Sequence, residues 1–386
     1  MRGAAVDRPR VNLLFIVSSL CVGGAEMHAL TLAARLDPAR YRVSLAYLKD
    51  EAPLLARLAH PSLDSEVFCC GVGRKLDMAA VAMLAAHIRR RGIDIVVCAN
   101  AYSLLYGWLA RLRSGCRPRM VEVFHTTQLD TFKDHLQMMV YRPLIGISDM
   151  LVYVSENQRR FWRTRYLRAR RDATIRNGID TAWFADRYSA EDKARLRREW
   201  GMEGKSYLVG LCAAMRPEKA HGDLLEALVR VRAAGVDAGV VFIGDGPERR
   251  RIEARIQALG LAPHVRITGY MADVRPALAA CDAIALVSHA VEAFSIAALE
   301  AMALGKPLIM SRVGGADEQV EHGVQGYLFP PRDIDQLAGH ILALAHSGNG
   351  TDMGRRARAR VEDSFTVERM LASYHALFDG LAGAGR

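Results

Sequence analysis

Short apolar runs alternate with longer segments of helical periodicity along this chain, and the alternating pattern occurs twice. Each apolar run has the length of a buried strand, about four to eight residues. Strands that alternate with helices form parallel sheets whose two faces are covered by helices. The pattern therefore predicts an α/β protein with two Rossmann-like, doubly wound domains.

The residue ranges of the expected elements follow from this pattern. In the first half, strands are expected at 11–18, 42–48, 65–69, 94–98, 119–124 and 150–154, with helices that include 25–36, 77–91 and 101–113. In the second half, strands are expected at 207–213, 239–243, 264–267, 283–287 and 307–310, with helices at 222–234, 247–259, 273–280, 295–304, 334–346 and 352–362. A final helix at 366–381 has one apolar face, and we expect it to pack on the first domain.

The two halves are expected to meet near residues 180–205. Asn177-Gly178-Ile179-Asp180 is typical of a turn, and the segment 189–205 is charged and has no strand pattern. A chain of 386 residues is long enough for two domains of ordinary size. We therefore expect an N-terminal domain over 1–185, a C-terminal domain over 186–365, and a helix over 366–386 that returns to the N-terminal domain.

Glycine-rich or polar turns follow several of the expected strands. Doubly wound sheets bind ligands outside the carboxyl ends of their strands, so these turns are candidate binding loops. They contain Gly23-Gly24, His125 and the capping box Ser155-x-x-Gln158 in the first domain, and Arg216 to Lys219, Gly244-x-Gly246 and Glu292 in the second. We expect the two sheets to face each other and to enclose a cleft lined by these turns.

Two carboxylates, Glu292 and Glu300, flank the start of the helix expected at 295–304. The free N–H groups at the start of a helix can bind a diphosphate. The carboxylates can accept hydrogen bonds from sugar hydroxyl groups on either side of it. This layout suits a nucleotide sugar, although spacing alone leaves open a pair of glutamates that face solvent.

Cysteine usage and the apolar runs indicate a cytoplasmic protein. The seven cysteines are scattered, and they form neither a CxxC motif nor a zinc-binding cluster, which favours reduced thiols. The run 11–20 has the apolar core of a signal peptide, but a glycine turn and a helical pattern follow it, so we do not expect export. No apolar stretch reaches the ~20 residues that span a bilayer.

Positive charge is concentrated in the first half. Residues 1–180 contain 27 lysines and arginines and 16 acids, and eight of the arginines lie between Arg159 and Arg176. A basic face suggests contact with an anionic membrane surface, such as the inner face of the plasma membrane, or with an anionic lipid-linked acceptor. A solvated, arginine-rich helix is an equally simple explanation. Nucleic acid is not expected, because the chain has no helix-turn-helix, zinc-finger or RNP pattern.

In their order along the chain, the motifs resemble those of the retaining glycosyltransferases of family 4, which have the GT-B architecture. The resemblance spans essentially the whole chain. It includes Gly23-Gly24-Ala25-Glu26, Asn177-Gly178-Ile179-Asp180, Arg216-Pro217-Glu218-Lys219, Gly244-Asp245-Gly246-Pro247, Glu292 to Glu300 with Ala301-Met302-Ala303, Gly314-Gly315-Ala316-Asp317-Glu318, and Gly326 to Pro331.

The resemblance implies three catalytic positions. Lys219 would neutralise the departing diphosphate, His125 would lie near the reacting carbon, and Glu292 would orient the donor sugar without acting as a nucleophile. The acceptor hydroxyl would attack from the face of the leaving group, and a diphosphate oxygen would take its proton. Oriented N–H groups and a cation stabilise such a leaving group, so neither a metal nor another cofactor is expected.

The resemblance also implies a donor-binding set. Glu300 would hold the ribose hydroxyls, backbone amides of residues 294–296 would bind the diphosphate, and Gly24 would allow its backbone to approach the phosphates. The expected donor-binding residues are Gly23, Gly24, Arg216, Gly244, Gly246, Tyr270, Met271, Phe294, Ser295, Ile296 and Glu300.

Two other motifs are better explained by structure. Asp333-Ile334-Asp335 has the DxD spelling of metal-dependent transferases, but it opens an expected helix, so capping explains it better than metal binding. Gly244-x-Gly246 lacks the third glycine of a dinucleotide fingerprint, which makes a dehydrogenase a weak alternative.

The chain departs from the family pattern beside these motifs. Ala214 stands where the family commonly has the arginine that accompanies the lysine on the diphosphate, with Arg216 as the nearby basic residue. Ala293 and Ser295 stand where glycines are usual. These changes leave the sugar open.

The expected function is a cytoplasmic, metal-independent, retaining hexosyltransferase. It would move a sugar from a nucleotide donor, with UDP favoured, to a hydroxyl of a glycan or glycolipid in cell-surface polysaccharide biosynthesis. Two alternatives stay open: a nucleotide-sugar epimerase of the same fold, and a protein that binds a nucleotide sugar without catalysis.

Overall fold

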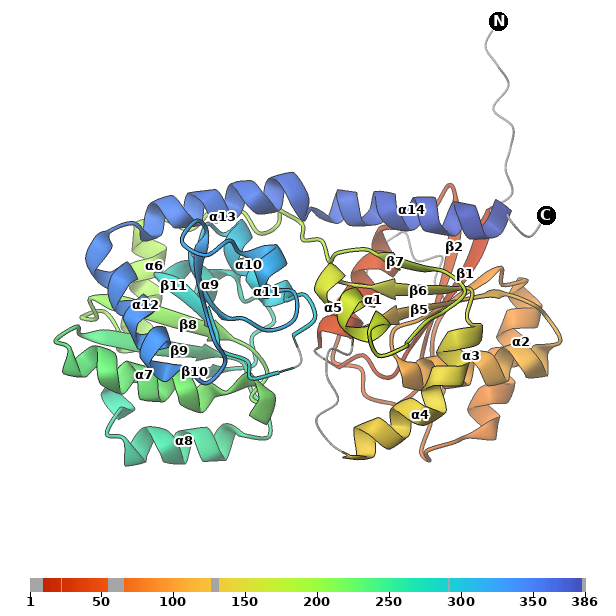
Figure 1. The fold of residues 1–386 in the computed structure, drawn as a ribbon, viewed down its shortest axis with the longest axis horizontal. Coiled ribbons are helices and arrows are strands. Elements are labelled where there is room, and N and C mark those ends of the chain that lie inside the picture. The colour runs from red at the N-terminus through yellow and green to blue at the C-terminus, as the bar shows by residue number, and fades with distance from the viewer. Residues whose placement is uncertain (1–9, 22, 55–65, 126–131, 291, 384–386) are drawn as a thin grey trace, which may run out of the picture. The chain divides into compact units, whose positions relative to one another are not determined.

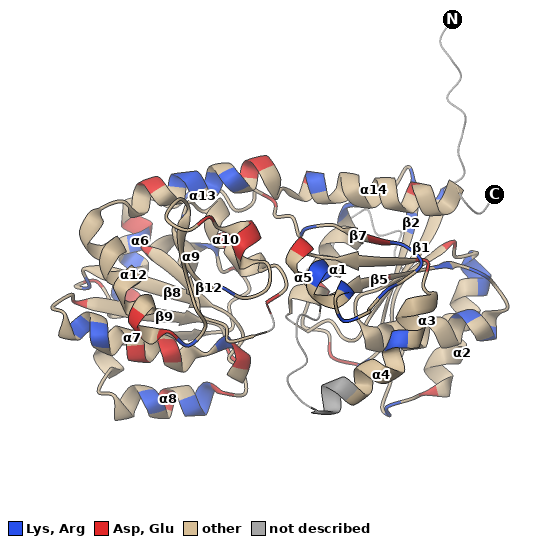
Figure 2. Ribbon diagram, in the orientation of Figure 1, with Lys and Arg blue, Asp and Glu red and all other residues tan. Residues whose placement is uncertain are grey.

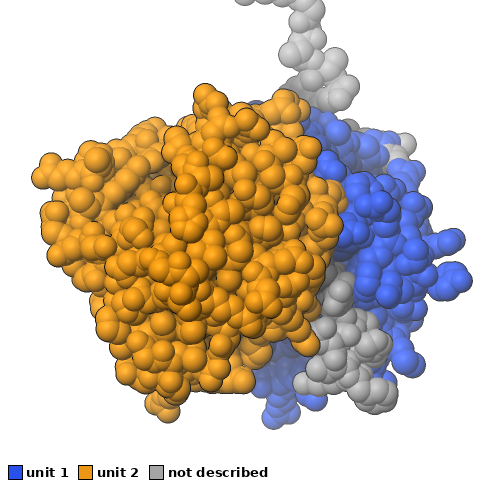
Figure 3. All heavy atoms as spheres, turned by 60° about the vertical axis from the view of Figure 1, so that its left-hand side comes forward, with its two compact units in different colours: residues 1–176, 370–386 blue, residues 177–369 orange. Residues whose placement is uncertain are grey.

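The computed structural model describes residues 10–21, 23–54, 66–125, 132–290 and 292–383 (Figure 1). The chain divides into two compact units. Unit 1 contains residues 1–176 and 370–386, and unit 2 contains residues 177–369 (Figure 3). Each unit is built around one parallel sheet, so the predicted pair of Rossmann-like domains is confirmed.

The sheet of unit 1 has the strand order β3-β2-β1-β4-β5-β6-β7, and all neighbouring strands are parallel. Its strands are β1 (Val11–Val17), β2 (Tyr41–Tyr47), β3 (Glu66–Cys69), β4 (Ile95–Cys98), β5 (Arg119–Phe124), β6 (Met150–Tyr153) and β7 (Asp172–Thr174). Its helices include α1 (Gly24–Arg35), α2 (Met78–Arg91), α3 (Ala101–Ser114), α4 (Phe132–Ile147) and α5 (Glu156–Arg163). The central strands are buried on both faces, which explains their continuous apolar sequences.

The sheet of unit 2 has the strand order β10-β9-β8-β11-β12-β13, again with parallel neighbours. Its strands are β8 (Tyr207–Cys212), β9 (Ala238–Ile243), β10 (Val265–Gly269), β11 (Ala283–Leu286), β12 (Leu308–Ser311) and β13 (Gly326–Phe329). Its helices include α6 (Ala190–Glu199), α7 (His221–Ala233), α8 (Arg249–Ala258), α9 (Arg275–Ala280), α10 (Ile296–Ala303), α11 (Ala316–Gln319), α12 (Ile334–Ser347) and α13 (Gly350–Ser364), with short 3-10 turns η2 (Pro217–Lys219) and η3 (Ala262–His264).

The direction in which strands are added reverses once in each sheet. In unit 1, β4 lies beside β1 on the side away from β2, and in unit 2, β11 lies beside β8 on the side away from β9. The loops that follow the two central strands lead to opposite sides at this point, and doubly wound sheets bind their ligands there. The candidate turns of the sequence follow these strands and their neighbours.

The last helix, α14 (Val367–Gly383), begins in unit 2 and belongs to unit 1 from Met370 onward. Its buried side chains include Met370, Tyr374, Phe378 and Leu381. The Tyr41 hydroxyl donates a hydrogen bond of 2.8 Å to Asp379 of this helix. The apolar face expected from the sequence therefore packs on the first domain.

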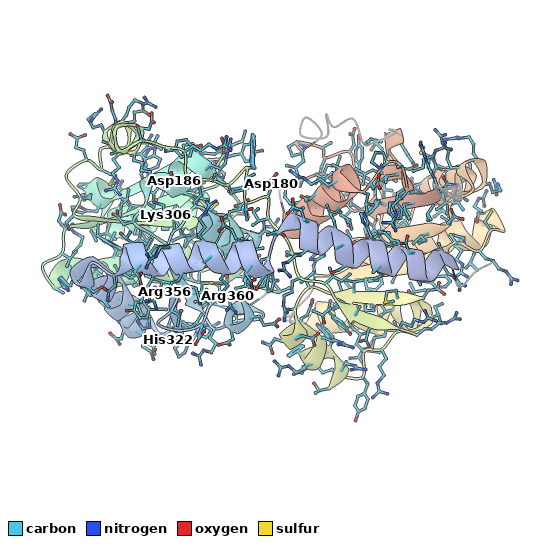
Figure 4. All side chains as sticks on the ribbon, turned by 90° about the horizontal axis from the view of Figure 1, so that it is seen from above. Asp180, Asp186, Lys306, His322, Arg356 and Arg360 are labelled. Carbon is cyan, nitrogen blue, oxygen red and sulfur yellow. The ribbon has the colours of Figure 1, made fainter. Side chains whose placement is uncertain are left out.

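The motif Asn177-Gly178-Ile179-Asp180 joins the beginning of unit 2 to the chain just before α14. Ile179 donates its N–H to the Phe365 carbonyl over 2.9 Å, and its carbonyl accepts the Val367 N–H over 3.0 Å. A Cβ atom on Gly178 would lie only 2.4 Å from the Thr366 oxygen, so only glycine fits there. The Asp180 carboxylate, labelled in Figure 4, accepts the N–H groups of Ala182 and Trp183.

Several elements were not expected from the sequence. Strand β7 has only three residues, Asp-Ala-Thr, β13 begins with a glycine, and α11 is a helix of four residues, so none of them gives a clear pattern. Helix α6 lies in the segment for which the sequence predicted only a charged stretch. It was not predicted because none of its residues is buried, so it has no apolar stripe. A capping box between Ser189 and Asp192 marks its start.

Within the described ranges, no helix is both long and apolar enough to cross a bilayer.

Candidate functional site

Lys219 and Glu292 meet at the carboxyl edge of the unit 2 sheet. Lys219 follows β8 and Glu292 follows β11, the two strands at the reversal. The Lys219 ammonium donates to Oε2 of Glu292 over 2.5 Å, and the Ser288 hydroxyl donates to the same oxygen over 3.2 Å. The two charged side chains are 23% and 17% exposed. The fold thus brings together two of the three catalytic candidates.

Backbone groups fix the position of the turn that carries Lys219. The turn η2 ends at Ala220, whose φ of +51° is left-handed and is unfavourable for a residue with a Cβ atom. His289, in the loop after β11, donates its backbone N–H to the Glu218 carbonyl over 2.9 Å. This bond ties the loop of Lys219 directly to the loop that leads to Glu292.

Gly244 and Gly246 allow the loop after β9 to pack against the loop after β8. A Cβ atom on Gly244 would lie 2.3 Å from the Ala213 oxygen, and one on Gly246 would lie 2.6 Å from the Met215 oxygen. Met215 donates its N–H to the Asp245 carbonyl over 3.0 Å. The close approach of the two backbones therefore explains both glycines without a ligand. The resemblance assigned the same two glycines to the nucleotide pocket.

The backbone on either side of Glu292 is also fixed. Gly314, with φ of +57°, approaches so closely that a Cβ atom there would lie 1.6 Å from the Glu292 carbonyl oxygen. Phe294 is buried against Phe365, and the Asn177 side chain donates to the Phe294 carbonyl over 2.8 Å. Phe294 thus lies in the core of unit 2 and contributes only backbone groups to the site.

Ser295 begins α10 and already uses its own amide. Its hydroxyl accepts the Ala298 N–H over 3.3 Å, so it caps the helix. Its N–H donates to the side chain of Gln319 over 3.0 Å, and the Gln319 amide donates back to the Ser295 carbonyl over 2.8 Å. Of the three backbone amides expected to bind a diphosphate, that of Ser295 already donates to Gln319, and Ile296 is the first residue of α10.

Other members of the donor-binding set lie around these loops. Glu300, one turn into α10, is close enough to raise the pKa of Cys212 at the end of β8, where burial is the larger cause. Tyr270 is exposed and Met271 partly exposed, and both follow Gly269, which pairs with Gly244. Arg216 is exposed beside η2, and no hydrogen bond joins its guanidinium to Lys219 or Glu292. Ala214 leaves only a methyl group at the position of the missing arginine.

The structure adds polar residues that the motifs did not mark. Ser288 donates to the Glu292 carboxylate, and Gln319 accepts the Ser295 N–H at the start of α10. Beside them, Nε2 of His289 lies 2.6 Å from the Asp223 carboxylate. His221 is buried against Phe242, and burial with the nearby Lys219 lowers its pKa to about 4. Ser288 and His289 lie in the loop after β11, whereas His221 and Asp223 begin α7 and Gln319 ends α11, so the polar types of these residues were the only signal available from the sequence.

The carboxyl edge of unit 1 carries the remaining candidates, Gly23, Gly24 and His125. Gly23 is the N-cap of α1, and its carbonyl accepts the Met27 N–H over 2.9 Å. A Cβ atom on Gly24 would have no neighbour within 4 Å, so the backbone there is open. His125 directly follows β5, and its Nε2 is buried without a hydrogen-bond partner among the described residues.

The environment of His125 keeps its imidazole neutral. Burial and the adjacent His28 lower the pKa of His125 to about 3. Its backbone is held from α5, because Gln158 donates to the carbonyl of Phe124 over 2.8 Å and accepts the Val154 N–H over 2.9 Å. Ser155 caps α5 as predicted, accepting the Gln158 N–H over 3.1 Å. The Gln158 side chain bridges β5 and β6 instead of completing the capping box at Ser155.

The acidic motif at 333–335 is part of a helix start. Asp333 is the N-cap of α12 and accepts the Gln336 N–H over 2.9 Å, so the capping explanation is confirmed. In the parts of the chain that the structure describes, no group of three or more His, Cys, Asp or Glu side chains is arranged to hold a metal ion.

The arginine-rich segment of unit 1 surrounds a hollow of about 620 Å³. Its lining residues are Met150, Arg159, Arg163, Arg168, Ala169, Arg170, Arg171 and Asp172. Asp172 pairs with Arg159 over 2.6 Å, whereas Arg168 and Arg171 are exposed. Figure 2 shows the positions of lysines and arginines on and beside α5 in blue. Met150 and Asp172 begin their strands, so this hollow lies at the amino edge of the sheet, opposite the edge that carries His125.

Two family models match the chain over its two units. The model described as Glycosyltransferase Family 4 matches residues 22–183, and the model described as Glycosyl transferases group 1 matches residues 192–360. Among curated proteins, the N-acetyl-alpha-D-glucosaminyl L-malate synthase of Bacillus anthracis is 28% identical over 305 residues, 78% of each chain. A GDP-mannose-dependent phosphatidylinositol monomannoside mannosyltransferase of Mycolicibacterium smegmatis is 30% identical over 62% of this chain and 64% of that protein.

Solved structures share the fold of the whole chain. The Anabaena protein HepE in complex with UDP-glucose matches with a TM-score of 0.84 at 24% identity, covering 96% of this chain and 100% of that one. Sucrose-phosphate synthase from Thermosynechococcus elongatus matches with a TM-score of 0.80 at 22% identity, covering 97% and 100%. With its two matching models, its ordered motifs and its two doubly wound units, the chain belongs to glycosyltransferase family 4 and has the GT-B fold.

Proposed function

We propose that this glycosyltransferase moves a sugar from a nucleoside diphosphate donor, with UDP as the nucleotide, to a hydroxyl of a glycan or lipid-linked glycan. The observation that carries the proposal is the Lys219–Glu292 pair, placed between the end of β8 and the start of α10. A cation and a carboxylate at that edge match the two needs of such a donor, which are charge neutralisation at phosphate and hydrogen-bond acceptors at sugar.

In the proposed reaction, the bond between the anomeric carbon and the diphosphate breaks as the acceptor oxygen bonds to the same face of that carbon. The acceptor proton passes to a diphosphate oxygen, so configuration is retained. Lys219 and the first amides of α10 stabilise the charge that accumulates on the leaving group. This arrangement needs no metal, and we expect the rate to be unchanged by EDTA.

The Lys219–Glu292 ion pair describes the site before the donor binds. An incoming diphosphate takes over the ammonium of Lys219 and frees the Glu292 carboxylate, which Ser288 still holds by a hydrogen bond of 3.2 Å. The freed carboxylate then accepts hydrogen bonds from hydroxyls of the donor sugar. Donor binding and orientation of the sugar are thereby linked through one exchange of partners.

Support for the nucleotide comes from relatives with different donors. The Anabaena structure contains UDP-glucose, while the mycobacterial relative is named as GDP-mannose-dependent. A calorimetric screen of UDP-, GDP- and ADP-sugars separates these donors. We expect a UDP-sugar to bind most tightly, and preferential binding of GDP-mannose would contradict the choice of nucleotide.

The proposal is tested by the variant Lys219→Ala, with donor turnover followed as release of UDP from UDP-glucose and UDP-N-acetylglucosamine. We expect turnover to fall at least a hundredfold, because a leaving-group cation contributes a few kcal/mol. Lys193→Ala is the matched control, since Lys193 forms a similar pair over 2.6 Å with Asp186, which is labelled in Figure 4 and lies in the same unit. Unchanged turnover in Lys219→Ala would refute the assignment.

The same assays distinguish the two alternative functions. An epimerase would convert the donor sugar without an acceptor and without net release of UDP. A protein that only binds nucleotide sugars would bind UDP tightly but release none from any donor, and the alanine at position 214 is the feature that keeps this alternative in view.

A further inference from the structure

His28 and Tyr374 lie next to His125 in unit 1, and the proposed function gives neither of them a role. The Tyr374 hydroxyl is 2.9 Å from Nε2 of His28. The rings of His28 and Tyr374 meet edge-on with centroids 5.5 Å apart, and those of His28 and His125 do so at 5.4 Å. A row of contacting rings therefore runs from α14 through α1 to the end of β5.

The contact between Tyr374 and His28 is closed to water. The Tyr374 side chain is fully buried, and His28 is only 3% exposed. Burial raises the pKa of Tyr374 above its ordinary value, so the phenol keeps its proton and stays neutral. A buried hydrogen bond between a phenol and an imidazole fixes both the rotation and the tautomer of the imidazole. Water cannot replace that bond when the hydroxyl is removed.

His125 depends on its neighbours for orientation. Its imidazole is neutral, and its buried Nε2 has no hydrogen-bond partner in the described residues, so no hydrogen bond among them fixes that nitrogen. Gln158 fixes the backbone just before it through the Phe124 carbonyl. The His28 ring is the aromatic neighbour that packs against its side chain. A small rotation of His28 therefore changes the direction in which His125 offers its nitrogen.

We propose that Tyr374 and His28 are positioning residues for His125. Tyr374 fixes the ring of His28, and His28 in turn holds the His125 imidazole in the orientation that meets the donor sugar. The inference rests on the proposed function, because it assumes that His125 contacts the donor. It assigns to the C-terminal helix a part in organising the active site, beyond its packing on the sheet of unit 1.

Tyr41 offers a matched control for this role. It is also a buried tyrosine at the contact between α14 and the rest of unit 1, and its hydroxyl donates to Asp379 over 2.8 Å. Its ring packs against His375 and Phe378 of α14. Tyr41→Phe and Tyr374→Phe each remove one buried hydroxyl and keep the ring, so they should cost similar stability. Only Tyr374→Phe should affect His125.

A double-mutant cycle tests the coupling. Release of UDP from UDP-glucose and UDP-N-acetylglucosamine is measured for Tyr374→Phe, Tyr41→Phe, His125→Ala and the double variant Tyr374→Phe/His125→Ala. We expect Tyr374→Phe to lower kcat about tenfold while the donor KM changes less than about twofold, because a misplaced group costs rate more than binding. In the His125→Ala background, the same substitution should have no further effect.

The outcomes separate this inference from the function on which it rests. If His125→Ala keeps the parental kcat, the role of His125 in the proposed function fails. If His125→Ala is slow but Tyr374→Phe is not, or if the two losses multiply in the double variant, the positioning role is overturned.

A measurement without substrate checks the same relationship. Nuclear magnetic resonance of the chain labelled with ¹⁵N-histidine reports the tautomer and charge of each imidazole. We expect Tyr374→Phe to change the tautomer ratio of His28 and to broaden the His125 signals, whereas Tyr41→Phe leaves both spectra as in the parent. Identical His28 and His125 spectra in the parent and Tyr374→Phe would contradict the proposal.

Discussion

The Lys219 ammonium lies 2.5 Å from the Glu292 carboxylate, although the two residues are 73 positions apart in the chain. Each is the main charged partner of the other at the carboxyl edge of unit 2. In the proposed function, a donor with a negative diphosphate displaces Glu292 from Lys219 as it binds. The pair would then set both the cost of donor binding and the moment at which Glu292 becomes available to the sugar.

Glu292→Gln should strengthen the binding of UDP and weaken sugar transfer. The amide removes the charge that competes with the diphosphate for Lys219, and partly buried pairs of this kind are worth about 1 kcal/mol, or roughly fivefold in Kd. Titration calorimetry with UDP measures the first effect, and UDP release from UDP-glucose the second. Glu300→Gln is the comparison variant and should weaken UDP binding; parallel losses of UDP affinity in both variants would contradict the exchange of partners.

Ala220→Gly should stabilise unit 2. Ala220 has φ of +51° at the start of α7, and a left-handed conformation costs an alanine about 1–2 kcal/mol. Glycine relieves this strain, but its higher conformational entropy in the unfolded chain offsets part of the gain. The expected gain is about 0.5–1 kcal/mol in the free energy of unfolding, measured by urea denaturation. Ala234→Gly, at the other end of the same helix with φ of −80°, should destabilise. A loss at Ala220 would mean that its conformation is not strained.

Gly178→Ala should destabilise the protein strongly. The added Cβ atom would lie 2.4 Å from the Thr366 oxygen, and both groups are backbone, so the bridge between Ile179 and Thr366 has to move. The expected loss is about 2–4 kcal/mol, which thermal unfolding detects as a clear fall in Tm. Gly380→Ala in α14 is the control, because nothing lies within 4 Å of its Cβ position, and it should be neutral or stabilising.

Glu122 should make the stability of unit 1 fall as the pH rises. It is fully buried in β5, neither carboxylate oxygen has a hydrogen-bond partner in the described residues, and burial raises its pKa well above the ordinary 4.5. The folded state then holds a proton that the unfolded state releases above pH 4.5. The stability from this group is complete below that pH and decreases as the pH rises toward the folded pKa.

The variant Glu122→Gln isolates this effect from other titrations. Its gain in free energy of unfolding over the parent should be small at pH 5 and larger at pH 8, measured by urea denaturation at both. A difference that does not depend on pH would show that Glu122 titrates normally in the folded protein.

The arginine hollow should promote binding to anionic membranes. Arg168 and Arg171 are exposed at its rim, and each basic residue near an anionic surface contributes about 1 kcal/mol. Arg168→Glu/Arg171→Glu should therefore reduce sedimentation with vesicles that contain phosphatidylserine by tenfold or more at low salt. Arg355→Glu/Arg356→Glu on α13 changes the net charge equally and should have little effect. Equal losses in both variants would indicate a general response to charge.

Local residue patterns sufficed to predict the parallel α/β architecture and most strands. Strands such as β1 and β11 are continuous apolar runs because both faces of a parallel sheet are buried, and that burial is visible in the chain itself. The apolar face of α14 was predictable for the same reason. Elements without a buried side, such as α6, or with only a few residues, such as β7, give no such pattern and appeared only in the structure.

The order of motifs indicated the family and named Lys219, Glu292 and His125, and the sequence went no further. Which side chains touch depends on strand order and on the close approach of backbones, which are set by contacts between distant residues. The pairing of Lys219 with Glu292, the use of the Ser295 amide by Gln319, and the row from Tyr374 through His28 to His125 exist because β8 lies beside β11 and α14 packs on unit 1. No local pattern encodes such neighbours, so tertiary structure alone decided them.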